Sequence, residues 1–181
     1  MKTLKIIVIA GVVLILALLL FLAFRPSSVH MERSIVINAA AERIFPYLNS
    51  ARMFKSWSPF SEIDTSAVYS FEGPAEGVGS KMTWTGNKDV GKGSQWIVLS
   101  EPNKTVKNGL AFEEMSGSYA ATFILTPEGT GTKLSWTFDC DASNLSFSGK
   151  MCAKIGGLFV ESKLGPTYEK GLNTLKNRLE N

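Results

Sequence analysis

The sequence has very little cysteine and histidine. Only Cys140 and Cys152 are cysteines, and His30 is the one histidine among 181 residues. Two cysteines are too few for a scaffold built from disulfides, and they lack the close Cys or His spacing of a zinc site. The two cysteines could form a Cys140–Cys152 disulfide or remain unpaired thiols, and we slightly favour unpaired thiols. We expect no metal, and stability must come from an ordinary apolar core.

Long runs of one charge are also missing. The 19 Lys and Arg residues are spread along the chain and nearly balanced by 16 Asp and Glu, for a formal net charge of +3. Nucleic-acid-binding surfaces need clustered basic residues, which this pattern does not supply. The pieces Gly77–Gly79 and Gly91–Gly93 lack the third glycine and following helix of a dinucleotide site. We therefore expect neither nucleic acid nor a cofactor.

One long apolar run is present near the N-terminus. Every residue from Ile6 to Phe24 is apolar or glycine, which as a helix spans about 28 Å and approaches the hydrocarbon thickness of a bilayer. We predict a short N-terminus over 1–5, a transmembrane helix over 6–24 and a polar linker over 25–28. A cleaved signal peptide is the main alternative, although the end of the run is a poor cleavage site. A buried core helix is the third possibility.

The flanking charges predict the orientation of this helix. Lys2, Lys5 and the amino terminus precede the run, whereas the charges that follow it nearly balance. The positive-inside rule then predicts a single-pass protein of the cell (inner) membrane with a cytoplasmic N-terminus and an extracytoplasmic domain. Because the linker is short, the domain would stay near the lipid surface.

Residues 29–181 predict a single α+β domain. The alternation over Val29–Asn38 indicates a strand, and Ala39–Leu48 a short helix interrupted near Pro46. The spacing of Phe54, Trp57 and Phe60 indicates a second short helix, which Pro59 ends. Repeated β-type runs separated by turn residues predict an antiparallel meander over Ala67–Cys140. Two short helices should therefore precede the meander.

A long helix should close the domain. Helical spacing resumes at Met151 and continues to Leu179, and the Gly165-Pro166 pair either starts the last helix or kinks a longer one. Within each strand of the meander, the apolar residues alternate with more polar ones and should face the same side of the sheet, so together they should form one buried face. These apolar residues are Val106, Leu110, Phe112, Tyr119, Ala121, Phe123, Leu125, Leu134, Trp136 and Phe138. One long helix can cover such a face.

The order of these elements resembles the START-like (SRPBCC) superfamily, in its polyketide cyclase/dehydrase and lipid-transport branch. The motifs that carry the resemblance are Arg33-Ser34-Ile35, Glu42–Leu48, Trp57-Ser58-Pro59-Phe60, Gly77-Val78-Gly79-Ser80 before Trp84, Gly131-Thr132 before Trp136, and Tyr168-Glu169-Lys170-Gly171-Leu172 with Leu175-Lys176. The resemblance implies a helix-grip fold, in which a curved antiparallel sheet wraps around the C-terminal helix and leaves an apolar cavity between them.

If that cavity exists, inward-facing apolar residues should line it. The candidates are Trp84, Phe112, Phe123, Trp136, Leu158 and Phe159. Each of these side chains could instead simply fill the core, because aromatic stripes are more often packing than binding surface.

The sequence offers no clear catalytic residue. His30 follows the apolar run directly, where an exposed linker or strand-edge position is more common than a catalytic base. Glu113 and Glu114 are adjacent and cannot both face one cavity, and Asp139 has the parity opposite to Trp136. Together with Asp141, these carboxylates are interpreted as solvated charges.

The sequence therefore predicts a membrane-anchored domain that binds a hydrophobic small molecule or lipid in an internal cavity. Two alternatives remain. A cyclase- or dehydratase-type enzyme would use the same cavity but needs a buried ionisable group with a shifted pKa. A protein-interaction module would instead have a filled core and an exposed apolar patch.

Overall fold

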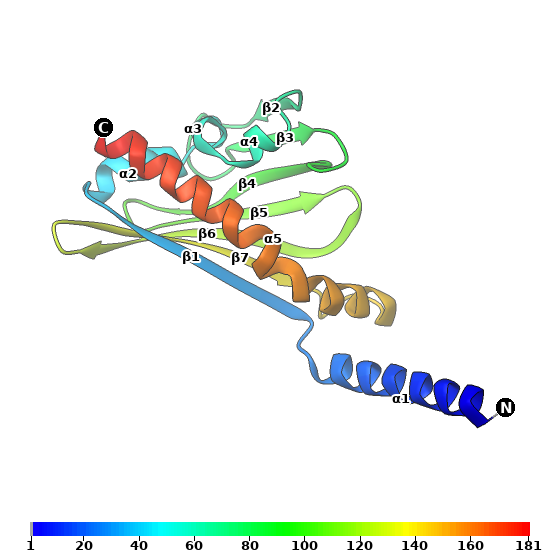
Figure 1. Ribbon diagram of the computed structural model, residues 1–181. Coiled ribbons are helices and arrows are strands. Elements are labelled where there is room, and N and C mark those ends of the chain that lie inside the picture. The colour runs from blue at the N-terminus through cyan, green and yellow to red at the C-terminus, as the bar shows by residue number, and fades with distance from the viewer. Residues whose placement is uncertain (1) are drawn as a thin grey trace.

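A computed structural model describes residues 2–181, and its N-terminal helix extends away from the rest of the chain (Figure 1). Helix α1 runs over Lys2–Phe24, and its segment Lys5–Phe24 is long and apolar enough to cross a membrane. Most of its described side chains are exposed, which excludes the buried core helix. The predicted span, Ile6–Phe24, lies within this helix.

A seven-stranded antiparallel sheet forms the body of the molecule. Its strands are β1 (Ser28–Ile37), β2 (Val68–Glu72), β3 (Lys81–Thr85), β4 (Lys92–Glu101), β5 (Thr105–Phe112), β6 (Met115–Glu128) and β7 (Gly131–Asp141). Their order is β1-β7-β6-β5-β4-β3-β2, so the meander from β2 to β7 is confirmed and the first strand pairs with the last. The predicted parity is confirmed as well, because residues such as Val106, Phe123 and Trp136 are buried.

Three short helices connect β1 to the meander, one more than predicted. They are α2 (Ala41–Leu48), α3 (Ala51–Trp57) and α4 (Phe60–Ile63). The second helix ends before Pro59, as predicted, because Ser58 has an extended backbone conformation (φ −60°, ψ 127°), and Phe60 belongs to the additional helix α4. A residue that precedes proline is disfavoured in the helical region, so Pro59 forces this break and a separate turn follows it.

The C-terminal helix α5 is a single element over Phe147–Glu180 that continues through Pro166. Proline removes one backbone hydrogen bond and kinks a helix. Arg33 of β1 bridges the two sides of this position, because its guanidinium lies 2.6 Å from Glu161 and 2.8 Å from Glu169. The hydrogen bonds to these carboxylates raise the pKa of Arg33. Of the two arrangements compatible with the sequence, the longer helix is therefore the correct one.

The two halves of α5 differ in burial. The second half buries Tyr168, Leu172, Leu175 and Leu179 against the sheet. Gly171 permits this close approach, because a Cβ there would lie 2.8 Å from Pro59 Cδ. No residue from Phe147 to Leu164 is buried. The helix thus buries side chains fully only in its C-terminal half. Its N-terminal half contacts the sheet more loosely, through Gly157 beside Val29 of β1 and through the partly buried Val160, and Figure 1 shows its first turns extending past the sheet toward α1.

Candidate functional site

An aromatic cluster fills the concave face of the sheet beneath the second half of α5. Trp136 of β7 stacks on Tyr168 with ring centroids 3.8 Å apart, and Phe123 of β6 lies 5.1 Å from Trp136. Phe54 and Trp57 of α3 each contact the rings of Phe123 and Trp136. Phe123 and Trp136, two of the predicted cavity residues, are each only 1% exposed. At this end of the sheet they form packed core.

A second aromatic row continues along the concave face away from this cluster. Trp84 of β3, Phe112 of β5, Tyr119 of β6 and Phe138 of β7 follow one another with ring centroids 5.9, 5.4 and 6.2 Å apart. Trp84 and Phe112 are only half-buried, unlike the packed cluster. This row, Trp84–Phe112–Tyr119–Phe138, is the incompletely covered part of the apolar face.

The remaining two predicted cavity residues lie on the first half of α5. Leu158 is 39% and Phe159 55% exposed. The structure therefore brings four of the six candidates together as two pairs, Phe123 with Trp136 and Trp84 with Phe112. Leu158 and Phe159 lie at the surface. Their roles in binding remain predictions.

Two polar side chains on the concave face were not predicted from the sequence. Asn108 of β5 is 1% exposed and Gln95 of β4 is 7% exposed. Among the described residues, the amide nitrogen of Asn108 and the indole nitrogen of Trp136 are buried without a hydrogen-bond partner. A buried donor left unpaired is costly and uncommon. The parity of β5 already indicated Asn108, because it lies between Val106 and Leu110 on the inward face.

The ionisable groups of this core favour their neutral forms. Burial raises the pKa of Tyr119, of the Cys140 thiol and of Tyr168. Both cysteines are free, with Cys140 buried and Cys152 exposed. Asp64 is the only buried carboxylate among the described residues, and hydrogen bonds from Ser66 and the Asn87 backbone lower its pKa. These hydrogen bonds give Asp64 a structural role in its loop.

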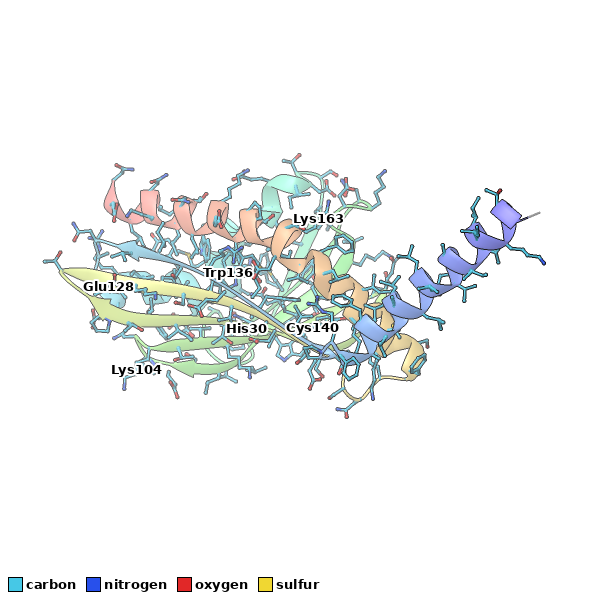
Figure 2. The ribbon with its side chains drawn as sticks, turned by 60° about the horizontal axis from the view of Figure 1, so that its bottom comes forward. His30, Lys104, Glu128, Trp136, Cys140 and Lys163 are labelled. Atoms are coloured by element: carbon cyan, nitrogen blue, oxygen red, sulfur yellow. The ribbon has the colours of Figure 1, made fainter. Side chains whose placement is uncertain are left out.

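The outer face of the sheet carries the histidine. His30 of β1 pairs across the strands with Asp139 of β7, and its Nδ1 lies 2.6 Å from the carboxylate (Figure 2). Both side chains are well exposed, which confirms the strand-edge interpretation of His30 and the outward parity of Asp139. The contact itself was not foreseen, because it depends on the register of β1 against β7. Glu113 likewise lies at the surface, paired with Lys92.

The described part of the chain has hollows at two places that bear on the site. One, of about 670 Å³, is lined by Pro26, Ser28, Val29, His30, Lys107, Ser118, Tyr119, Ala120, Asp139, Cys140 and Asp141. The other, of about 160 Å³, lies where α3 meets the β2–β3 loop, beside Arg52 and Phe71. Neither is lined by a residue of α5. The apolar cavity expected between sheet and helix therefore remains a proposal.

Comparison with known proteins identifies relatives by family and by fold. The family model described as polyketide cyclase / dehydrase and lipid transport matches residues 28–180. A search of curated proteins finds no match.

Several solved structures are similar to this chain. A protein from Chromobacterium violaceum is 16% identical with a TM-score of 0.55, over 87% of this chain and 99% of that chain. A protein from Rhizobium leguminosarum is 15% identical with a TM-score of 0.57, over 84% and 95% of the two chains. The di-domain ARO/CYC StfQ from the steffimycin biosynthetic pathway is 11% identical with a TM-score of 0.60, over 84% of this chain and 51% of that chain. At these identities the likeness shows the helix-grip fold alone.

Proposed function

This chain belongs to the polyketide cyclase / dehydrase and lipid transport family, and from that premise we propose that it binds a hydrophobic small molecule or lipid between the concave face of the sheet and α5. The observation that carries the proposal is the row Trp84–Phe112–Tyr119–Phe138, in which Trp84 and Phe112 are only half-buried. Small-molecule sites are mostly apolar and aromatic with a few polar groups. This row continues the core along the concave face, away from the packed aromatic cluster.

The two unpaired donors suggest what kind of apolar ligand fits. The Asn108 amide and the Trp136 indole are both donors on the same concave face. An amphiphile with a carbonyl or hydroxyl oxygen would supply an acceptor to either of them, whereas a pure hydrocarbon would leave both unpaired. A lipid-like molecule with a polar oxygen therefore fits better than a hydrocarbon.

Binding is favoured over a cyclase or dehydratase reaction. Such an enzyme needs an acid or base poised near neutral pH in the cavity. The ionisable side chains in the described core are Tyr119, Cys140 and Tyr168, and each has a raised pKa. His30 and Asp139 lie on the opposite face of the sheet. We therefore assign no catalytic residue.

The proposal also places the domain at a membrane. Helix α1 would act as a single-pass anchor, with the N-terminus in the cytoplasm and the domain outside the cell (inner) membrane. Its exposed apolar surface and its projection from the domain support this arrangement. Only Arg25, Pro26 and Ser27 separate α1 from β1, so the domain would remain next to lipid.

Native mass spectrometry of the full chain, released from detergent micelles, tests the binding proposal. Leu110→Trp adds bulk on the concave side of β5, and Ala111→Trp is its matched control on the exposed side of the same strand. We expect an apolar adduct on the wild type and on Ala111→Trp, and its loss from Leu110→Trp. Lipids that merely surround α1 would be retained by all three. A wild type without any specific adduct, even after incubation with fatty acids, would contradict the proposal.

A further inference from the structure

The first half of α5 carries an exposed apolar surface that the binding site does not account for. Phe147 is 80%, Ile155 44% and Phe159 55% exposed. These residues and Met151 and Leu158 recur at helical spacing, so they share one face of the helix. An exposed apolar face of this kind on a soluble domain marks a surface that contacts something else.

This surface, which we define as Phe147, Met151, Ile155, Leu158 and Phe159, lies beside the end of α1. The ammonium of Lys154 donates hydrogen bonds to the carbonyl oxygens of Leu22 and Ala23, at 3.0 and 3.1 Å. A helix leaves its last carbonyl groups unpaired, and a cation there is favourable. Leu22 is also buried, at 3% exposure. The contact fixes the start of α5 at the end of the candidate membrane span.

The charges around the surface suit a lipid headgroup region. Lys150 and Lys154 lie within residues 147–160, and that segment contains no Asp or Glu. Helices that lie in the plane of a membrane combine an apolar face with flanking Lys or Arg residues. Basic residues near a membrane are further attracted to anionic lipids.

From these observations we infer that residues 147–160 of α5 dock into the interfacial region of the same bilayer that α1 spans. The inference rests on the proposed membrane anchor. The bilayer is the favoured occupant because α1 ends in direct contact with this segment, and the linker of Arg25, Pro26 and Ser27 prevents the domain from moving far from it. Lipid would then cover the exposed apolar face of this segment, opposite the side that contacts the sheet through Gly157 and Val160.

The native Cys152 offers a probe of this docking. It is exposed, while Cys140 is buried, and it lies one heptad before Phe159 on the same side of the helix. A fluorescent NBD label on Cys152 should enter lipid with the apolar surface. The matched control carries the label on Glu128→Cys in a Cys152→Ser background, because Glu128 lies at the end of the sheet far from α1 (Figure 2).

The full chain would be placed in nanodiscs of phosphatidylcholine and phosphatidylglycerol containing a spin-labelled lipid. We expect the spin label to quench the emission from Cys152, because an interfacial helix buries its apolar face at the boundary of headgroups and acyl chains, and to leave the emission from Glu128→Cys nearly unchanged. Phe159→Asp should restore the Cys152 emission. Because Phe159 is exposed, this variant is expected to fold.

The outcomes separate this inference from the anchor on which it rests. A chain that does not enter nanodiscs at all would overturn both. A chain that enters them but leaves Cys152 unquenched and accessible to aqueous iodide would overturn docking alone, and the apolar surface would then be assigned to a protein partner or a second copy of the chain.

Discussion

Replacing Gly171 with alanine should destabilise the domain, although alanine is the better helix former. Gly-to-Ala in a helix interior is worth about 1 kcal/mol in favour of alanine. Here, however, the new Cβ would lie 2.8 Å from Pro59 Cδ and 3.0 Å from Trp136 Cζ3. Trp136 cannot easily yield, because it is 1% exposed and stacked on Tyr168. Overpacking of this kind costs about 1–3 kcal/mol, so after the gain from alanine we expect a net loss of up to about 2 kcal/mol.

Gly156→Ala is the matched control on the same helix. Nothing lies within 4 Å of the position that its Cβ would take, so this substitution should stabilise the domain by up to about 1 kcal/mol. Urea denaturation of both full-length variants in detergent, followed by tryptophan fluorescence, would give the two free-energy changes. Opposite signs are expected. If Gly171→Ala stabilised the domain as much as Gly156→Ala, the close packing of α5 on Pro59 and Trp136 would be refuted.

Three further predictions concern polarity, pH and orientation. Asn108→Leu removes a buried unpaired amide, so it should raise the urea midpoint while weakening binding of an oxygen-bearing amphiphile; a lowered midpoint would show that the amide is satisfied in the protein. Burial, with a smaller contribution from the charge of Asp139, raises the pKa of Tyr168. An unfolded tyrosine ionises at about pH 10. The contribution of Tyr168 to the free energy of unfolding should therefore be fully present below that pH and be lost as the pH rises above it. Tyr168→Phe should reduce this alkaline loss in urea titrations, and an unchanged pH profile would contradict the assignment. In a Cys152→Ser background, Glu128→Cys should react with a membrane-impermeant maleimide in intact cells, whereas Thr3→Cys in the same background should react only after permeabilisation; the reverse pattern would invert the proposed orientation.

The sheet was predictable because its strands obey a simple alternation. The inward parity of Phe123, Leu134 and Trp136 follows from period two alone, and it matches their burial. The end of the second short helix at Pro59 was predicted, but the separate turn α4 after it was not, because the helical spacing of Phe54, Trp57 and Phe60 assigns Phe60 to the same helix. The path of α5 through Pro166 could not be predicted, since it depends on Arg33, distant in sequence, bridging Glu161 and Glu169.

The candidate site was only partly predictable for a related reason. Parity identifies which strand residues face inward, but it does not say how completely the helix covers them. Phe123 and Trp136 are packed beneath α5, whereas Trp84 and Phe112 are only half-covered. Leu158 and Phe159 had the correct helical spacing, but they lie on an exposed face of α5, while Gly157 and Val160 of the same segment contact the sheet and core. The coverage of an inward face is a tertiary property that local spacing does not encode.

Tryptophan quenching by a brominated fatty acid tests ligand binding on the concave face most directly. The four tryptophans all lie outside α1, so the full chain in nanodiscs reports on its domain. Trp84 belongs to the half-buried aromatic row, and Trp96 lies on the opposite face of the sheet, against Gly109. We predict saturable quenching that is largely lost in Trp84→Phe and retained in Trp96→Phe. Quenching that never saturates, or that depends on Trp96 instead of Trp84, would contradict a binding site between the sheet and α5.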